Sequence, residues 1–500
     1  MRETNMLVIM ADQHNPKMLG CNGHELVKTP NLDRLANQGV NFKSAYTNSP
    51  ICVPARACFA TGRYVHDTGC WDNAFAYEGK QPSWGHRLQD NGNSVVSIGK
   101  LHYRSEEYDT GFDEQIIPMH ITNGVGDVHG AIRPELAVRY QARQYVEQVG
   151  PGDTNYAEYD RDITRRACDW LLEKGKTTTE KPWVLFVSLV HPHFPLIAPQ
   201  EFYDMYPLAD LPEFKPADEE LFANHPWWKA FNNCFIYEQF FRDDEHRKIT
   251  LASYLGLCSF MDNNVGQVLA ALTASGMEDE TRIIYTSDHG DNMGARRIWG
   301  KSTWHEESAG IPMLMTGPDV PINETIDTPV SLVDIFPTIL EGAGAPLGKG
   351  DETLPGRSLL EIAVGENNVE RTVFGEYHAA GATSAAYMLR TNRYKYVHYA
   401  DGFDPELVHY AGGFDPELYD LENDPEELRN IAHDPGYSEL ISSFRSQLES
   451  ILDPEATNER ALNDQRLLVK KYGGRDAIIA RGSGNNTPLP GEKSVVFTPQ

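Results

Sequence analysis

The stretch NMLVIMADQ, residues 5–13, decides the fold class. Its unbroken apolar run, MLVIMA, is short and bounded by polar residues, which is typical of a β-strand buried on both faces. Asp12 and Gln13 follow this run directly, and His14 comes next. In open α/β sheets, functional sites form at the carboxyl ends of the strands. We therefore expect a buried strand that delivers these polar side chains to a site.

Three later segments repeat this arrangement. They read SVVSIGKLH at 94–102, PWVLFVSLVHPH at 182–193 and TRIIYTSDHG at 281–290, and each apolar run ends in polar, ligand-like residues. Helical patterns separate the strands, and the longest runs from about Asp243 to Ala274. This alternation predicts an α/β fold with a large, doubly wound, mainly parallel sheet flanked by helices.

The C-terminal part of the chain has a different pattern. Beyond about residue 370, short alternating segments predict a smaller antiparallel sheet, followed by a helix over about 437–452. We accordingly divide the chain into three parts: a catalytic α/β domain at 1–370, an antiparallel subdomain with a helix at 371–455, and an extended tail at 456–500.

Two features of this C-terminal part concern the surface. Residues 397–418 hold a near-perfect tandem repeat, VHYADGFDPEL followed by VHYAGGFDPEL. Two short copies are too few for a repeat architecture, so we interpret them as a duplication that lengthens a surface loop. The apolar residues of the tail are scattered and need cover, which predicts that it packs against a neighbouring subunit of a homo-oligomer, a dimer or a tetramer.

Charge and composition exclude several functions. The 500 residues carry a formal net charge of -28, which argues against a nucleic-acid partner because phosphate would be repelled. The apolar segments are too short for a signal peptide or a membrane span. The seven cysteines are scattered, without a disulfide framework. We expect a cytoplasmic protein without a membrane partner, whose small anionic substrate would need a local cluster of basic residues.

The ends of two strands supply candidate metal ligands. Asp12 with Gln13, and Asp288 with His289, offer hard oxygen donors and one imidazole. This set suits a single divalent cation, Ca²⁺ or Mn²⁺ with Mg²⁺ as the third candidate, better than a structural zinc ion. The alternative is that each aspartate only caps the helix that follows it.

Basic and protonatable side chains follow the same strands or lie in the loops after them. If they converge, they would form an anion trap in an otherwise acidic protein. Taken singly, each is a surface charge or a core histidine with satisfied hydrogen bonds. The candidates are Arg56, Lys100, His102, His193 and Lys301.

The segment CVPARACFATGR, residues 52–63, presents a cysteine without an obvious base beside it. Cys52 could be a buried thiol, the usual role of a free cysteine. It could also be a thiolate nucleophile whose pKa is lowered by Arg56 and by a helix N-terminus. A third interpretation needs no base, because the thiol would not itself be the nucleophile.

Cys52, Pro54 and Arg56, followed by Thr61-Gly62-Arg63, resemble the signature of the formylglycine-dependent sulfatases of the alkaline phosphatase superfamily. Segments in the same order over nearly the whole chain resemble that family too, GKLH, HPHFP and YTSDHGDNMG among them. The resemblance implies an arylsulfatase-like hydrolase of sulfuric esters. In it, a formylglycine-generating or equivalent enzyme oxidises Cys52 to Cα-formylglycine, whose hydrated diol is the nucleophile.

The resemblance also implies roles for single residues. Asp12, Gln13, Asp288 and His289 match the metal-ligand positions, and the modified Cys52 completes the coordination. Arg56 and Lys100 resemble the residues that hold the formylglycine, and His102 resembles the group that helps to break the hemiacetal. His193 and Lys301 match positions that bind sulfate oxygens and assist the leaving group. Asn73 matches an asparagine that contacts the transferred group.

The segment around Asn73 resembles a subgroup that contains choline sulfatase, phosphonate monoester hydrolases and bacterial arylsulfatases. Hydrolysis of phosphonate monoesters or phosphodiesters on the same scaffold is therefore the main alternative. A choline pocket needs acids and aromatic faces around the ammonium group, and EYHAAG at 376–381 offers no second acid after Glu376, so choline ranks lower. A third possibility is an anion-binding protein without catalysis, in which Cys52 stays unmodified.

Overall fold

The computed structural model describes residues 2–133, 135–177, 180–214, 225–400, 414–482 and 487–492. Its centre is an eight-stranded sheet in the order β11-β2-β10-β9-β1-β7-β4-β5. Four neighbouring strands in it run parallel to one another: β1 (Asn5–Asp12), β4 (Ser94–Lys100), β7 (Trp183–Pro192) and β9 (Thr281–Ser287). The four strands predicted to end in ligand-like residues are therefore neighbours.

One strand inside this sheet is antiparallel to the others. β10 (Met313–Thr316) runs antiparallel to β9 and to β2 (Gly39–Phe42), and all the other pairings in the sheet are parallel. β11 (Glu324–Ile326) and β5 (Glu114–Met119) form the two edges. The prediction of a mainly parallel α/β sheet is thus confirmed.

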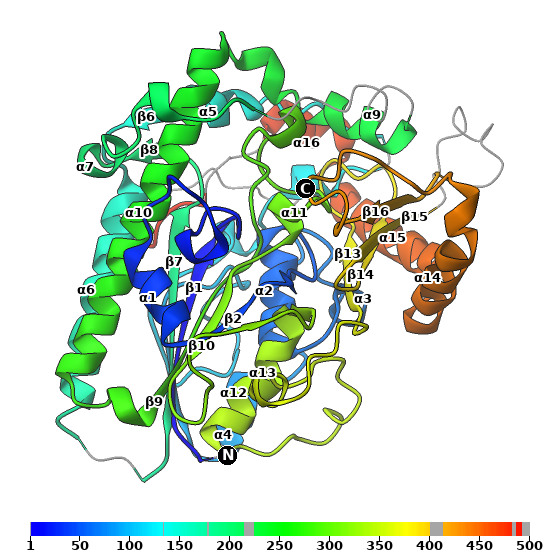
Figure 1. Cartoon of the computed structure of the whole chain (residues 1–500). Coiled ribbons are helices and arrows are strands. Elements are labelled where there is room, and N and C mark those ends of the chain that lie inside the picture. The colour runs from blue at the N-terminus through cyan, green and yellow to red at the C-terminus, as the bar shows by residue number, and fades with distance from the viewer. Residues whose placement is uncertain are drawn as a thin grey trace.

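Helices cover both faces of the sheet, as Figure 1 shows. Alternate residues of β1 belong to two different apolar clusters, with Leu7 and Ile9 in one and Met6 and Val8 in the other. The first cluster includes side chains of α1 (Pro30–Asn37), α6 (Asn155–Lys174) and α10 (Asp244–Ala274). The second includes side chains of α2 (Cys52–Thr61), α4 (Trp84–Asp90), α12 (Ile335–Ala343) and α13 (Leu359–Val364). The sheet is therefore doubly wound.

A second, antiparallel sheet lies beside the first (Figure 1). Its strands are β13 (Val373–Tyr377), β14 (Ala386–Arg390), β15 (Tyr394–Tyr399) and β16 (Glu417–Asp420), in that order. Phe444 and Leu448 of α14 (Ser438–Ile451) pack against one face. Trp227 and Trp228 of α9 (Pro226–Cys234) pack against the other. The predicted smaller antiparallel sheet with its helix is therefore present.

The expected extended tail is helical over much of its length. α15 spans Pro454–Lys471 and α16 spans Arg475–Arg481. Asp453 caps α15 through the N–H of Ala456, and the side chains of Ala461 and Leu462 are buried. Val469 and Ile478 pack in a cluster with Val128 and Ile132 of the same chain, so these apolar residues already have cover. The prediction of an extended tail is wrong because polar residues such as Thr457 and Gln465 share the buried face of α15, which leaves no regular apolar pattern in the sequence.

Most of the tandem repeat, residues 401–413, lies outside the described residues; β15 and β16 flank it. Among the described helices, none is long and apolar enough to cross a membrane. The shorter elements are β3 (Ala45–Tyr46), β6 (Val149–Pro151), β8 (Leu196–Ala198), β12 (Val330–Ser331), α3 (Val65–Thr68), α5 (Ala142–Glu147), α7 (Gln200–Tyr203) and α11 (Glu306–Ala309).

Candidate active site

Two neighbouring strands deliver the acidic side chains of the site. β1 and β9 pair in parallel with Ala11 opposite Ser287, so Asp12 and Asp288 leave the sheet side by side. Both side chains are fully buried. The ring of His289 follows, with Nε2 at 3.6 Å from Asp288 Oδ1 and 3.9 Å from Asp12 Oδ1. The parallel register therefore explains why residues far apart in the sequence meet.

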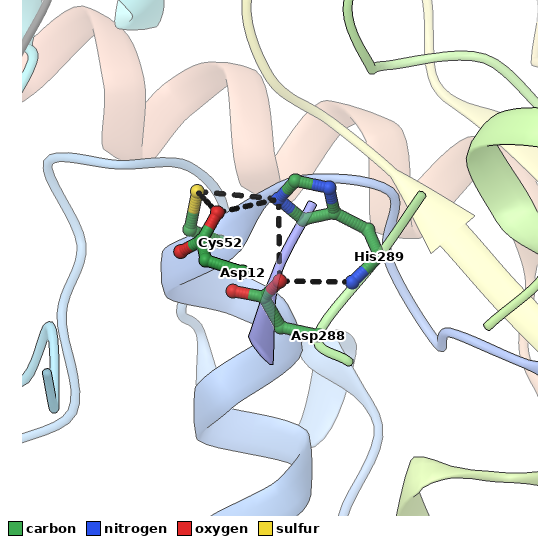
Figure 2. A group of neighbouring side chains, drawn as sticks. All are labelled: Asp12, Cys52, Asp288 and His289. Carbon is green, nitrogen blue, oxygen red and sulfur yellow. Dashed lines mark hydrogen bonds and ion pairs between the residues drawn. The ribbon is translucent and has the colours of Figure 1, made fainter. Parts of the chain in front are cut away.

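Cys52 is the first residue of α2 and joins this group. Its Sγ lies 3.2 Å from His289 Nε2 and 3.8 Å from Asp12 Oδ1 (Figure 2). Ile51 before it is in an extended conformation, so the chain turns into the helix at the cysteine. Every residue of α2 is buried. Cys52 is therefore held by a rigid helix in the protein interior.

Four buried side chains could hold one metal ion, because a ligand atom of each lies within 4.8 Å of the others; they are Asp12, Cys52, Asp288 and His289. Gln13 offers a further donor, because its Oε1 is buried and has no hydrogen-bond partner among the described residues. Its Nε2 donates to Asp291 Oδ2 at 2.5 Å, which fixes the amide with its oxygen left over. Carboxylate, amide and imidazole donors of this kind fit a divalent cation.

Arg56 links the two aspartates from inside the protein. Its Nε donates to Asp288 Oδ2 at 2.8 Å, and its Nη2 donates to Asp12 Oδ2 at 3.3 Å. Its Nη1 donates to the carbonyl oxygen of Lys100 at 2.8 Å and to Ser188 Oγ at 2.9 Å. The guanidinium is 1% exposed, so Arg56 is no surface charge. It holds the carboxylates in place and offsets part of their charge.

Two lysines bring further positive charge. Lys100 Nζ lies 2.6 Å from Asp12 Oδ2, and Lys301 Nζ donates to Cys52 Sγ at 2.9 Å. Burial raises the pKa of Asp12, but Lys100 and the other cations around the site hold it well below its usual value. Burial and the Asp12 carboxylate raise the pKa of the Cys52 thiol, and the nearby cations, Lys301 first, lower it below its usual value. The site therefore stabilises negative charge on its own side chains.

Two histidines of the site are buried beside its cations. His193 stacks on Phe194 with ring centres 4.1 Å apart, and its Nδ1 donates to the Phe194 carbonyl oxygen at 2.7 Å. His102 has a backbone φ of 55°, and its Nε2 lies 2.9 Å from Thr487 Oγ1. Burial, assisted by nearby lysines, lowers the pKa of both rings well below the usual value. Each ring can therefore accept a proton on one nitrogen.

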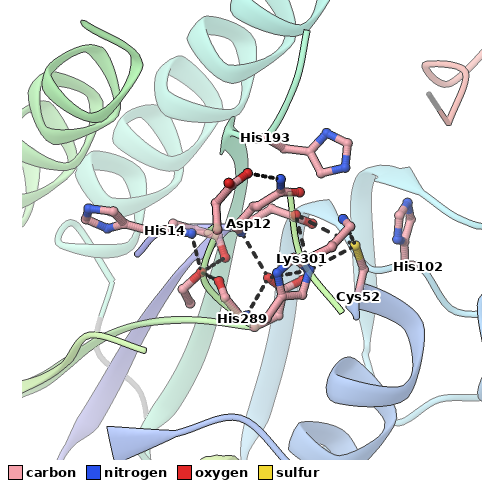
Figure 3. A network of polar contacts seen from close by, with 12 residues as sticks. Asp12, His14, Cys52, His102, His193, His289 and Lys301 are labelled. Atoms are coloured by element: carbon pink, nitrogen blue, oxygen red, sulfur yellow. Dashed lines mark hydrogen bonds and ion pairs between the residues drawn. The ribbon is translucent and has the colours of Figure 1, made fainter. Parts of the chain in front are cut away.

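Asn73 and His14 differ in their relation to this centre. Asn73 Oδ1 accepts a hydrogen bond from the Val53 N–H at 3.1 Å, so its side chain holds the start of α2 beside Cys52. His14 points away from the group (Figure 3), with Nδ1 at 2.7 Å from Tyr285 Oη. Burial lowers the pKa of His14 to about 4. It is a core histidine with hydrogen-bond partners.

Three residues that contact the site were not found from the sequence. Asp291 accepts hydrogen bonds from Gln13 and, at 3.2 Å, from the Tyr145 hydroxyl. Its place three residues after Asp288 was an available signal. Ser188 lies inside a buried strand and Thr487 lies 385 positions from His102, so no local pattern marks either residue.

Comparisons with known proteins identify the family of this chain. The family model described as Sulfatase matches residues 4–345, and the model described as N-sulphoglucosamine sulphohydrolase, C-terminal, matches residues 294–453. A choline-sulfatase of Rhizobium meliloti (strain 1021) is 31% identical over 467 residues, covering 90% of this chain and 87% of that protein. Arylsulfatase K of Bos taurus is 30% identical, with coverage of 90% and 82%.

Solved structures resemble the fold over almost its whole length. The phosphonate monoester hydrolase of Agrobacterium radiobacter superposes with a TM-score of 0.71 at 25% identity, covering 90% of this chain and 95% of that one. A 2-O GAG sulfatase superposes with a TM-score of 0.70 at 21% identity, with coverage of 93% and 94%.

Proposed function

The chain belongs to the sulfatase family and is a hydrolase of sulfuric esters, and from this premise we propose that a formylglycine made from Cys52 carries its reaction. The observation that supports this most is the place of Cys52. Its Sγ is within 3.2 Å of His289 Nε2 and 2.9 Å of Lys301 Nζ, at the centre of the candidate metal ligands. In this argument Sγ stands in for an oxygen of the hydrated aldehyde.

The proposed metal site uses Asp12, Gln13, Asp288 and His289, with the modified Cys52 as a further ligand. A divalent cation bound there would polarise the sulfate oxygens and favour the ionised form of the diol. Arg56 and Lys100 hold the formylglycine end of the site, and they also limit the repulsion between the two aspartates. The donor set supports a single ion, Ca²⁺ or Mn²⁺, with Mg²⁺ as the third candidate.

The reaction divides into two steps. In the first, the formylglycine at position 52 would supply the oxygen that bonds to sulfur, while the bond from sulfur to the ester oxygen breaks and the leaving alcohol takes up a proton. His193 and Lys301 would bind the sulfate oxygens and assist this departure. In the second step, His102 would take the proton of the remaining hydroxyl, so that the C–O bond to sulfate can break. Water then adds to the aldehyde and restores the diol.

Replacing Cys52 with serine tests the nucleophile. A serine can accept sulfate, but it has no second hydroxyl with which to expel it. Cys52→Ser should therefore release about one equivalent of alcohol per chain at most and then stop. Intact-mass measurement of the parent protein should show the aldehyde at Cys52. Steady turnover by Cys52→Ser near the parental rate would point instead to hydrolysis of a seryl intermediate.

Phosphonate monoesters and phosphodiesters are the second candidate substrate class. The phosphonate monoester hydrolase that superposes over 90% of the chain favours it. Both anion types are tetrahedral and would meet the same cations, so we propose that sulfate esters are preferred and phosphonates are side substrates. The ratio of kcat/KM for matched aryl sulfate and phosphonate esters decides between them.

A choline ester is less well supported. Glu376, the acid considered for an ammonium group, is fully buried and accepts hydrogen bonds from His66 and His378. It therefore offers no free carboxylate to a substrate. A larger ester, such as an aryl sulfate, needs no such acid.

We propose further that the protein is a cytoplasmic homo-oligomer, a dimer or a tetramer. All seven cysteines are free, which supports a reducing compartment. A formylglycine-generating or equivalent enzyme would be its processing partner. Light scattering and fractionation of the native source test the assembly and the location.

A further inference from the structure

A segment close to the C-terminus reaches the catalytic centre. Thr487 Oγ1 lies 2.9 Å from His102 Nε2, although 385 positions separate the two residues in the sequence. The Tyr156 hydroxyl donates to the Thr487 carbonyl oxygen at 2.6 Å. Leu489 packs against the apolar cluster to which Tyr156 belongs. The threonine is therefore fixed by its main chain on one side and contacts His102 with its hydroxyl.

A second polar contact holds the same segment to α6. Asn155 Nδ2 donates to Glu492 Oε1 at 3.0 Å, and the Leu489 N–H donates to Glu492 Oε2 at 3.0 Å. Asn155 and Tyr156 form the first turn of α6, so one helix end fixes residues 487–492 at two points. The position of Thr487 thus follows from several contacts.

His102 itself has few restraints on its ring. Its N–H donates to the Met119 carbonyl oxygen at 2.8 Å, which fixes the main chain. On the ring, Nδ1 is buried without a hydrogen-bond partner among the described residues, and Nε2 has Thr487. A neutral imidazole carries its proton on one nitrogen, and the partner of the other nitrogen decides which one. If Thr487 Oγ1 accepts from Nε2–H, the lone pair lies on Nδ1.

We propose that Thr487 is a positioning residue for His102, which holds the proton on Nε2 and leaves Nδ1 as the base. The inference rests on the function proposed above, in which His102 takes a proton when the aldehyde re-forms. When Nδ1 takes that proton, both ring nitrogens become donors, and Thr487 Oγ1 accepts from the second one. Thr487 gains and loses no proton in this step, because its hydroxyl oxygen accepts a hydrogen bond from His102 both before and after the proton transfer.

Thr487→Val tests this role, because valine has nearly the same shape and cannot accept a hydrogen bond. With an aryl sulfate, we expect kcat to fall about five- to tenfold, the effect of one lost hydrogen bond in the second step. The first turnover should keep its rate, so a burst of aryl alcohol appears and KM falls together with kcat. Thr487→Ser should restore the parental kcat. Tyr156→Phe, which frees the Thr487 carbonyl, should reproduce part of the fall.

Several results would overturn the proposal. Parental kcat in Thr487→Val shows that the hydroxyl is not used, and failure of Thr487→Ser to restore kcat shows that shape is what matters. A fall in kcat/KM without a burst places the effect in binding or in the first step. Parental kcat in Tyr156→Phe rejects the clamp. If the parent enzyme never forms the aldehyde at Cys52, the proposed function fails first, and intact mass identifies that case separately.

Discussion

Replacing Glu376 with glutamine should weaken the fold and leave the reaction unchanged. The Glu376 carboxylate lies between two imidazoles, with His66 Nδ1 at 2.7 Å from Oε1 and His378 Nε2 at 2.8 Å from Oε2. Burial raises the pKa of this carboxyl, but the charge of His66 and the hydrogen bonds from His378 and His66 outweigh it and lower the pKa from 4.5 to about 2. Glutamine has the same shape but carries no charge.

The difference between these two pKa values corresponds to about 3 kcal/mol of folding free energy, since one pH unit is worth about 1.4 kcal/mol. Because the folded pKa is the lower one, this contribution is complete above the unfolded pKa and is lost as the pH falls towards the folded value. Urea unfolding at pH 6 should therefore find Glu376→Gln less stable by about 3 kcal/mol, and at pH 4 the gap should narrow by about 1 kcal/mol.

Asp420→Asn is the matched control, because its partner Arg393 is 43% exposed and solvent should screen that pair. Its loss of stability should be much smaller than that of Glu376→Gln. Equal stability of Glu376→Gln and parent at pH 6 would refute the argument. So would a raised KM for a quaternary ammonium sulfate ester, because that result would place Glu376 in the substrate pocket.

Three further predictions concern the metal, the buried arginine and the tail. Chelation of the metal should lower the midpoint of thermal unfolding and abolish activity, and one equivalent of a divalent cation should restore both. Elemental analysis that finds two tightly bound ions per chain would contradict the single site. Arg56→Met should lower the free energy of unfolding by about 3–5 kcal/mol, because two buried carboxylates lose the partner that they share. An unfolding midpoint in urea equal to that of the parent would contradict this. Truncation after Arg481 spares the buried side chains of α15 and should lower the oligomer mass by light scattering, whereas an unaltered mass would place the subunit contact elsewhere.

The sequence could predict the strands and their polar ends because burial on both faces leaves a continuous apolar pattern. The run before Asp12 and the run before Asp288 were enough to identify two buried strands of one parallel sheet. The pairing of β1 with β9 became known only from the structure, because the periodicity of apolar residues does not determine the order of strands in a sheet. The resemblance to a family supplied the roles of the site residues.

Other contacts could not be predicted, for physical reasons. The hydrogen bond from Gln13 to Asp291 and the one between Thr487 and His102 join side chains across the fold, and such pairs leave no spacing pattern. Helix α15 lacks a clear apolar pattern because its buried side chains include the polar residues Thr457, Asn458 and Gln465. Its Asp453 cap followed by Pro454 was a local start signal that the weak apolar pattern outweighed.

The burial of α2 limits when the oxidation of Cys52 proposed above could take place. The thiol is 1% exposed and every residue of the helix is buried, so an enzyme that must hold this segment in its own active site would have to act before the chain folds. The yield of oxidised protein would then depend on whether Cys52 is oxidised before the nascent chain folds. Rapid overproduction should yield correctly folded but inactive molecules, which no later treatment with the processing enzyme can rescue. The specific activity of a preparation would thus record the conditions of its synthesis.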